Sequence, residues 1–203
     1  GTSHRFIWRA TNEFLGGDVH KLVSLHLGSG ASLCAIEDGK CMDTTMGLTP
    51  LDGLIMGTRC GTLDPATVFF LSREGGYSID EIDTMMNKQS GMLAVSGVSS
   101  DSRDIEAGAE NGDENCKMAL EMFYYRTAQL TSEMVCSMEG VDTMVFTAGI
   151  GENSAEMRQG VADRLAWLGV QIDPELNAIR SGEPRVISAP DSKIRVLVVP
   201  TNE

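Results

Sequence analysis

The sequence has little of what marks several special classes of protein. Aromatic residues make up 5% of the 203 residues, and no apolar run is long enough to cross a bilayer or resembles a secretory signal. The five cysteines are odd in number and include no Cys-x-x-Cys pair, which argues against a disulfide framework and against a zinc site. We therefore expect a protein of a reducing, cytoplasmic compartment.

Positive charge is also scarce. The chain has 16 lysines and arginines against 29 acidic residues, a formal net charge of −13. A continuous basic surface for nucleic acid or anionic lipid is therefore not expected, and an anionic small ligand must be held by individual arginines and backbone N–H groups. The hydrophobic share of 42% is typical of a soluble globular protein.

Two common catalytic motifs are missing as well. The sequence has no Gly-x-Ser-x-Gly elbow and no Walker A lysine motif, which disfavours acyl-serine chemistry and P-loop phosphoryl transfer. It begins at Gly1 without an initiator methionine and ends at Glu203, directly after an apolar run where an α/β fold would normally add a covering helix. We therefore expect a piece of a longer protein.

The hydrophobic pattern predicts one α/β domain with a mixed five-stranded sheet flanked by helices. The first three strands are expected to be antiparallel, since Asp38-Gly39 is a strong hairpin signal, and the last is a continuous apolar run typical of buried parallel strands. Residues 90–116 are expected to be loop or short helix. The predicted strands are 21–27, 32–37, 40–45, 142–146 and 194–199, and the predicted helices are 3–15, 65–72, 79–88 (with a Ser78 and Glu81 capping box), 117–138 and 154–168.

The stretch 46–65 has a single basic residue, Arg59, between Gly57 and Gly61. Glycines let the backbone approach a ligand, and a guanidinium binds carboxylate or phosphate through two hydrogen bonds, so this stretch predicts an anion site. The alternative is an arginine that forms an ion pair with Asp52 or Asp64 and merely fixes the loop.

A second candidate site follows the strand 142–146. The glycine-rich run 147–154 lies between a strand and a helix, where amide N–H groups suit a phosphate or a nucleotide. The run nearly matches Gly-x-Gly-x-x-Gly, and Asp173 could serve as a ribose-binding acid, so a dinucleotide-binding fold is the rival interpretation. The predicted three-stranded meander upstream argues against that rival.

Two further groups of residues allow a structural or a functional interpretation. His26 ends the first strand just before Gly28 and Gly30, and a histidine there is either a packing residue or a catalytic one. Asp101 and Arg103 place opposite charges in a polar loop, where solvated charges are the default interpretation.

Six motifs, taken in order, resemble the second half of the acetate kinase family and its short-chain acyl kinase relatives. They are GTSHR, HLGSGAS, DTTMGLTPLDGLIMGTRCGTLDP, SGVSSDSRD, FTAGIGENS and PTNE, and they cover essentially the whole chain. Six motifs in register are far more specific than any one of them. One departure is Ser29, which replaces the asparagine of the usual HLGNG.

The resemblance implies a ribonuclease H-like fold of the acetate and sugar kinase, Hsp70 and actin superfamily. Residues 1–203 would be the C-terminal nucleotide-binding domain, without the N-terminal domain. The implied activity is reversible phosphoryl transfer from ATP to acetate, giving acetyl phosphate and ADP with Mg²⁺ or Mn²⁺, in a cytoplasmic homodimer with no nucleic-acid or membrane partner. A propionate or other short-chain acyl kinase is the close alternative, and an inactive nucleotide-binding module is another for these residues by themselves.

The resemblance also implies roles for individual residues. Arg59 matches the arginine that binds the acyl carboxylate and the phosphoryl group, Pro50 lies where the acyl pocket is lined, and His26 matches the histidine that hydrogen-bonds the phosphoryl group. Glu203 matches the magnesium-associated glutamate. The stretches implied to bind the nucleotide are His26, Leu27, Gly28, Ser29 and Gly30, then Asp101, Ser102 and Arg103, then Gly149, Ile150, Gly151, Glu152 and Asn153. Phosphoryl transfer needs mainly positioning and donors on the phosphoryl oxygens, which agrees with these roles.

Overall fold

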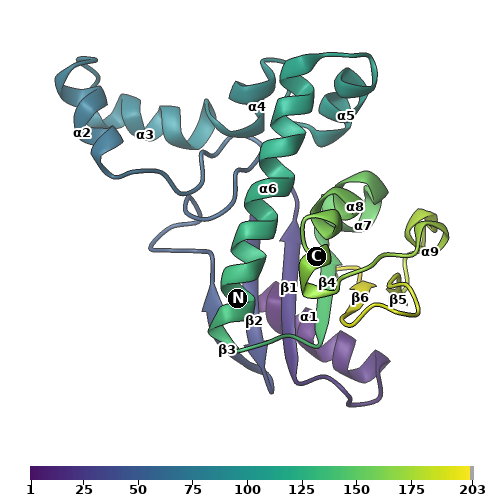
Figure 1. The fold of residues 1–203 in the computed structure, drawn as a ribbon. Coiled ribbons are helices and arrows are strands. Elements are labelled where there is room, and N and C mark those ends of the chain that lie inside the picture. Colours follow the sequence, from purple (N-terminus) through teal and green to yellow (C-terminus); the bar gives the residue numbers. More distant parts are fainter. Residues whose placement is uncertain (202–203) are drawn as a thin grey trace. The chain divides into compact units, whose positions relative to one another are not determined.

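The computed structural model describes residues 1–201, and its contacts divide them into two compact units (Figure 1). The first unit combines residues 1–45 with the chain from Tyr124 onward, and the second is Met46–Phe123. The first contains the whole sheet and the second is helical. Within residues 1–201, no helix is both long enough and apolar enough to cross a membrane.

A six-stranded sheet in the order β3-β2-β1-β4-β6-β5 forms the centre of the first unit. β1, β4 and β6 are parallel, whereas β2, β3 and β5 run antiparallel to their neighbours. The predicted mixed α/β class is confirmed, but the prediction of five strands was wrong, because β5 has only two residues and leaves no pattern. The strands are β1 (Lys21–Leu27), β2 (Ala31–Glu37), β3 (Lys40–Thr44), β4 (Thr143–Thr147), β5 (Arg185–Val186) and β6 (Arg195–Val198).

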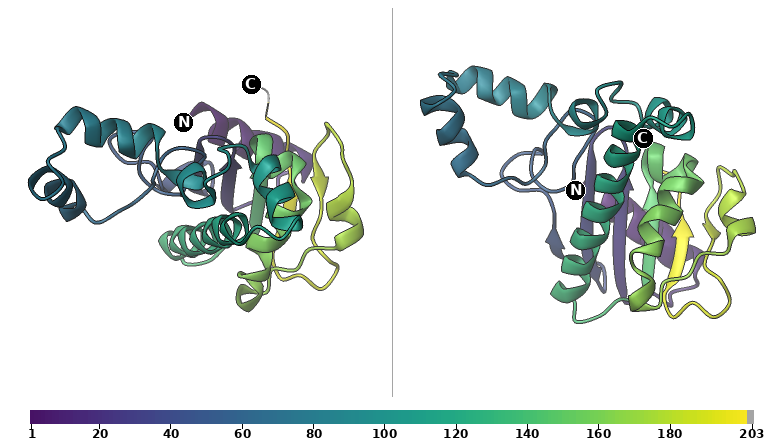
Figure 2. Two further views of the ribbon diagram at one scale, coloured as in Figure 1. Left: turned by 90° about the horizontal axis from the view of Figure 1, so that it is seen from above. Right: turned by 45° about the horizontal axis from the view of Figure 1, so that its top comes forward.

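Helices cover both faces of this sheet (Figure 2). α1 (Thr2–Phe14) packs Ile7 and Trp8 on the face that carries Leu22 and Cys34, and residues 124–137 of α6 (Glu114–Ser137) lie on the opposite face. Side chains of neighbouring strand residues alternate between these two faces. His26 and Leu22 therefore lie on the α1 face.

The chain after β4 differs from the prediction of a turn followed by one long helix. α7 (Ala148–Asn153) is a short helix that starts directly at the end of β4, and α8 (Ala155–Asp163) ends earlier than expected. Ser154 ends α7 and caps α8 through a hydrogen bond from the Met157 amide at 3.0 Å. A 3₁₀ turn (Ala166–Leu168) and α9 (Pro174–Ala178) then lead to β5.

The second unit contains the stretch 46–65, four complete helices and the first residues of α6. α2 (Ala66–Arg73) and α3 (Ile79–Lys88) confirm two predicted helices, and the Ser78 and Glu81 capping box is present. The polar region 90–116, predicted as loop or short helix, forms α4 (Gly91–Ser96) and α5 (Ser102–Glu110) before α6 begins.

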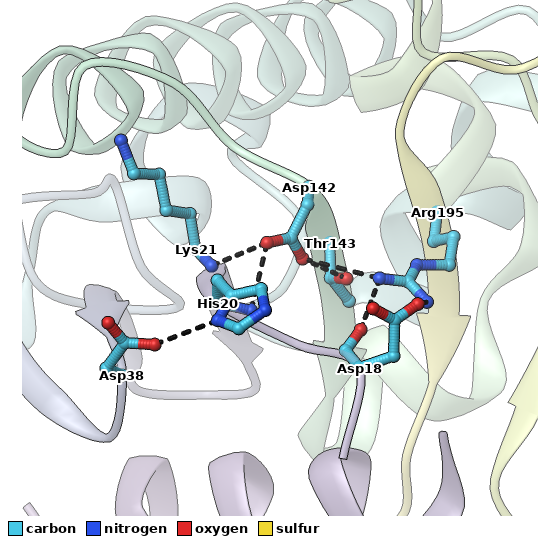
Figure 3. A network of polar contacts seen from close by, with 7 residues as sticks. All are labelled: Asp18, His20, Lys21, Asp38, Asp142, Thr143 and Arg195. Carbon is cyan, nitrogen blue, oxygen red and sulfur yellow. Dashed lines mark hydrogen bonds and ion pairs between the residues drawn. The ribbon is translucent and has the colours of Figure 1, made fainter. Parts of the chain in front are cut away.

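A polar network ties the parallel strands together at their amino-terminal ends (Figure 3). The Asp142 carboxylate, just before β4, accepts hydrogen bonds from the amide N–H groups of His20 at 3.0 Å and Lys21 at 2.6 Å. Arg195, at the start of β6, lies 3.8 Å from the other Asp142 carboxylate oxygen. Ligands of open α/β sheets bind outside the carboxyl ends of the strands, so we assign this network to stability.

Candidate functional site

Two glycine-containing segments lie side by side at the carboxyl ends of β1 and β4. His26, near the end of β1, is paired in register with Thr147, the last residue of β4. A Cβ built on Gly28 would lie 3.3 Å from the Gly30 carbonyl oxygen and 3.9 Å from the Gly149 amide nitrogen. The loop after β1 therefore lies within van der Waals distance of the start of α7, and the tight contact of a Cβ at Gly28 would be with the Gly30 carbonyl of its own loop.

Not all atoms of these segments face outward. The Leu27 side chain is fully buried in the sheet, so only its main chain could contact a ligand, whereas Ser29 is exposed at the tip of the β1–β2 loop. A Cβ on Gly149 would meet no atom within 4 Å, so open space lies beside this residue. The carboxyl edge of the sheet thus offers small residues and main-chain groups.

Ala148 starts α7 in the left-handed region, at φ 66°, where residues with a Cβ are uncommon. Glu152 holds this conformation, because one of its carboxylate oxygens accepts hydrogen bonds from the amide N–H groups of Ala148 and Thr201, both at 2.9 Å. The Asn153 side-chain amide donates to the Gly149 carbonyl at 2.9 Å. Two residues expected to bind nucleotide therefore also hold the strand-to-helix connection together.

Arg158 is buried beside α7 and binds its carbonyl groups, a role that no sequence pattern indicated. Its side chain is 2% exposed and donates to the carbonyl groups of Gly151 at 2.9 Å and Glu152 at 3.0 Å, and to the Asn177 side chain at 2.7 Å. Burial, and then the nearby charge of Arg185, lower the pKa of Arg158 to about 10. An arginine in a helical pattern is normally a surface residue, so the pattern gave no signal for this role.

His26 is half-buried, and the ring of His4 from α1 packs against it edge to face at 6.0 Å between centroids. The two nitrogens of His4 each lie 2.9 Å from a serine hydroxyl, those of Ser24 and Ser32. Burial first, and then the neighbouring His26, lower the pKa of His4 to about 4. His4 is therefore a neutral ring at neutral pH that fixes the position of His26.

Arg59 lies in the second unit beside an open cavity of about 580 Å³. Its guanidinium donates to the Pro50 carbonyl at 3.3 Å, so these two residues of the expected acyl site lie together. Asp52 instead accepts from the Thr62 hydroxyl at 2.6 Å, and Asp64 accepts from an amide of α2. Within residues 1–201 no ion pair joins Arg59 to either aspartate, so the ion pairs of the structural alternative are absent, although the bond to Pro50 links Arg59 to its own loop. The cavity is lined by Thr49, Leu51, Thr58, Arg59, Asp83, Asn87 and Lys88.

The segment between α3 and α4 holds the Arg59 loop (residues 56–60) through main-chain hydrogen bonds. The Ser90 amide donates to the Thr58 carbonyl at 3.0 Å, and the Met92 amide donates to the Met56 carbonyl at 2.8 Å. Such bonds fix the main chain on both sides of Arg59, so its side chain starts from a defined position.

Gly91 lies at the centre of this contact, and the sequence analysis did not single it out. Its φ is +65°, and a Cβ on it would lie 2.2 Å from the Met56 carbonyl oxygen and 2.8 Å from that of Arg59. A side chain at this position would therefore push the Arg59 loop away.

Asp101, Ser102 and Arg103 form the start of α5. Asp101 caps the helix by accepting from the Arg103 amide at 3.0 Å, and its carboxylate forms an ion pair with the Arg103 guanidinium at 2.6 Å. The hydrogen bonds from Arg103 lower the pKa of Asp101 to about 2. The Arg103 side chain is 85% exposed, so this pair is open to solvent, and its contact with a nucleotide stays a prediction.

The expected metal ligand, Glu203, lies outside the described residues. Within residues 1–201, no three side chains of His, Cys, Asp or Glu come together as a metal-binding group. Mg²⁺ in phosphoryl-transfer sites is bound by one or two carboxylates together with substrate phosphates, so such a group is not required.

The dinucleotide-binding alternative is wrong. That fold begins with parallel βαβ units, whereas β1, β2 and β3 form an antiparallel meander in this sheet. The Asp173 carboxylate, the supposed ribose ligand, caps α9 by accepting from the amides of Glu175 and Leu176 at 2.9 and 3.0 Å.

Comparisons with known proteins agree with the motifs. The sequence model described as "Acetokinase family" matches residues 1–203. An acetate kinase of Oleidesulfovibrio alaskensis is 52% identical over all of this chain and 51% of its own length. Among solved structures, Porphyromonas gingivalis acetate kinase has a TM-score of 0.94 at 42% identity, and a Francisella tularensis propionate kinase 0.93 at 40%; each match covers all of this chain and 51% of that one. The chain thus spans about half the length of the curated relatives it matches.

Proposed function

Because the chain belongs to the acetokinase family, we propose that it is the C-terminal, nucleotide-binding domain of an enzyme that transfers a phosphoryl group between ATP and acetate. The observation that supports this most is the close approach of the loop after β1 to the start of α7, at the carboxyl edge of the parallel strands. Small residues and main-chain groups at that edge suit a nucleotide and its phosphates.

In the proposed reaction an acetate oxygen attacks the γ-phosphorus of ATP, the bond to the bridging oxygen breaks, and ADP leaves with that electron pair. The acetate carboxylate is already ionised at neutral pH and needs no general base. His26 therefore acts by hydrogen bonding to the phosphoryl oxygens, and Arg59 binds the carboxylate and the charge of the transferring group through its two-pronged guanidinium.

The nucleotide-binding role is proposed for residues 26–30, 101–103 and 149–153. Main-chain N–H groups and the Ser29 hydroxyl are the donors of the first stretch, Arg103 is the cation of the second, and the open space beside Gly149 would accept the nucleoside. Mg²⁺ or Mn²⁺ would neutralise phosphate charge, with Glu203 as the proposed protein ligand.

The acyl substrate could also be propionate, since one similar structure is named a propionate kinase. Initial rates of the complete protein with acetate and with propionate, as kcat/KM, distinguish the two activities.

We further propose a cytoplasmic homodimer. Four large apolar side chains of the α2–α3 region are exposed, which is typical of a contact surface. They are Phe69, Phe70, Tyr77 and Ile79. Light scattering on the complete protein and on a Phe69→Ser, Phe70→Ser variant tests this assembly, with loss of the dimer expected in the variant.

Binding of ADP to the 203-residue chain tests the nucleotide role directly. We expect weak binding by calorimetry, and Gly149→Gln should abolish it, because the new side chain fills the proposed nucleoside space. A Cβ at this position meets no atom within 4 Å, and circular dichroism checks that the variant is folded. In the complete enzyme this substitution should raise the KM for ATP while leaving the KM for acetate little changed. A folded chain that binds no ADP at millimolar nucleotide would contradict the proposal.

A further inference from the structure

Two of the five cysteines lie together on the edge of the sheet. The Sγ atoms of Cys34 on β2 and Cys41 on β3 are 3.4 Å apart. The other three cysteines, Cys60, Cys116 and Cys136, are also thiols, so all five are in the reduced form. A sulfur–sulfur bond is about 2.05 Å long, so closing the Cys34–Cys41 pair requires the atoms to approach by roughly 1.4 Å.

A β-bulge produces this arrangement. Cys34 pairs with Thr44 and Ile36 pairs with Cys41, and the register shifts between these pairs so that Met42 has no partner. Side chains alternate along a strand, so in a regular ladder Cys41 would point to the opposite face from Cys34. The extra residue brings Cys41 to the same face, diagonally across from Cys34.

The two thiols differ in access. Cys34 is 2% exposed and belongs to the hydrophobic cluster under α1, with Ile7 and Leu22, whereas Cys41 is exposed at the outer strand. A reagent in solution therefore reacts with Cys41 first. Cys34 can then react only with the disulfide that has formed at Cys41. An accessible thiol for the first attack and a second thiol within reach of it are what formation of an intrachain disulfide by thiol–disulfide exchange requires.

We propose that Cys34 and Cys41 form a cross-strand dithiol site that reacts with low-molecular-weight disulfides, such as glutathione disulfide, to give an intrachain disulfide. The Cys41 thiolate attacks one sulfur of the reagent, a mixed disulfide forms, and one glutathione thiol leaves. The Cys34 thiolate then attacks Cys41 Sγ and expels the second glutathione thiol. Two protein thiols are oxidised and one disulfide is reduced to two thiols, so atoms and electrons balance.

The attack of Cys34 on the mixed disulfide is expected to limit the rate at which the intrachain disulfide forms. In the reduced pair, burial first, and then the hydrogen bond and charge of Cys41, raise the pKa of Cys34 to about 12, and burial still raises this pKa when Cys41 carries glutathione. Only the thiolate attacks, and below the pKa its fraction rises roughly tenfold per pH unit. The mixed disulfide at Cys41 should therefore accumulate near neutral pH and close to the intrachain disulfide more rapidly in alkaline solution.

A metal ion is a poorer occupant of this pair. A tetrahedral thiolate site needs four ligands, and in the described part of the chain no third His, Cys, Asp or Glu joins the two cysteines. The geometry favours a covalent bond between the two sulfurs.

Peptide mapping can detect the bond directly. Trypsin cleaves after Lys21, Lys40 and Arg59, so the two cysteines fall in separate peptides, 22–40 and 41–59. The folded protein is treated with glutathione disulfide at about pH 7.5 and at about pH 9, alkylated and digested without reduction. We expect the two peptides to be linked, and we expect linkage to form faster at the higher pH.

Three variants separate the steps. Cys34→Ser should stop at a glutathione adduct on Cys41, and Cys41→Ser should leave Cys34 unmodified in the folded protein. Cys136→Ser, which removes an exposed cysteine elsewhere, should leave the linked peptides unchanged. Circular dichroism checks that each variant is folded, and Cys34→Ala replaces Cys34→Ser if the serine variant unfolds. Glutathione on Cys41 without any linked peptide at the higher pH would overturn the proposal, as would linkage of Cys34 to another cysteine.

Discussion

At the residue scale, Arg59 differs from two other arginines in its partner. Arg103 forms an ion pair with Asp101, and Arg195 forms one with Asp18, whereas Arg59 contacts a neutral carbonyl beside a cavity. A guanidinium that is not neutralised by a neighbouring carboxylate retains its attraction for an anionic ligand. Together with the cavity beside it, this supports Arg59 rather than Arg103 or Arg195 as the proposed substrate-binding residue.

We expect Arg59→Ala in the complete enzyme to lower kcat/KM by at least roughly a hundredfold, because it removes a charge partner of the transition state. Arg59→Lys should also lower kcat/KM, since an ammonium cannot make the two parallel hydrogen bonds of a guanidinium. Arg126→Ala is the matched control, because this arginine is on α6 and donates to the Gln129 side chain at 3.4 Å. Steady-state kinetics with acetate and ATP provide the measurement; near-normal values for both Arg59 variants would remove it from the reaction.

At the scale of elements, the connection between α3 and α4 positions the Arg59 loop. The relevant residue is Gly91, where φ is +65° and a Cβ would meet the Met56 carbonyl oxygen at 2.2 Å. Gly97 at the end of α4 has nearly the same φ, +68°, but a Cβ there meets no atom within 4 Å. The two glycines therefore separate the cost of the backbone conformation from the cost of a collision.

Gly97→Ala should reduce the free energy of unfolding by about 1 kcal/mol, the usual cost of a left-handed conformation for alanine. Gly91→Ala should reduce the free energy of unfolding by more than this. It should also lower kcat, because the loop that carries Arg59 must move. Urea unfolding together with kinetics on both variants tests this. Equal effects of the two substitutions on kcat would show that the Arg59 loop does not depend on this contact.

The polar network at the opposite ends of the strands should affect stability without affecting catalysis. Asp142→Ala leaves the partly buried Lys21 amide and the exposed His20 amide without their acceptor, which should cost about 1–3 kcal/mol of unfolding free energy. Asp18→Ala removes an ion pair whose aspartate is 76% exposed, and should cost about 0–1 kcal/mol. Denaturant unfolding gives both values, and a loss of kcat in folded Asp142→Ala would contradict the assignment to stability.

At the scale of the whole molecule, His4 makes stability depend on pH. Its pKa is about 4 in the folded protein against 6.5 in the unfolded chain, so between these values the unfolded chain binds more protons and acid favours unfolding. The free energy of unfolding should therefore fall by about 2 kcal/mol from about pH 7 to about pH 5. His20 has the opposite sign, because its partner Asp38 raises its pKa, but it is exposed at the surface.

Urea unfolding at several pH values in this window measures the effect. His4→Gln keeps a group that can bond to Ser24 and Ser32 and should flatten the dependence on pH, whereas His20→Gln should leave the His4 contribution in place. The lowered pKa of Asp101, about 2, affects only more acidic solutions. An unchanged slope in His4→Gln would mean that His4 is not the titrating group.

Local patterns in the sequence determined most of the elements of this protein. Alternating and continuous apolar runs located five of the strands, Asp38-Gly39 located a hairpin turn in which both residues have positive φ, and Ser78 with Glu81 located the start of α3. The interactions that form these features join residues only a few positions apart in the chain. The six motifs identified the family in the same way, since they are strings of residues in order.

Tertiary structure alone decided what depends on distant partners. β5 exists because β6 offers it hydrogen bonds, Arg158 is buried because the carbonyl groups of α7 accept from it, and Cys41 faces Cys34 only because a bulge shifts the register. Gly91 is a necessary glycine because the Arg59 loop, over thirty positions earlier, passes against it. The residues next to these features in the sequence do not predict them, because the contacting atoms come from other segments of the folded chain.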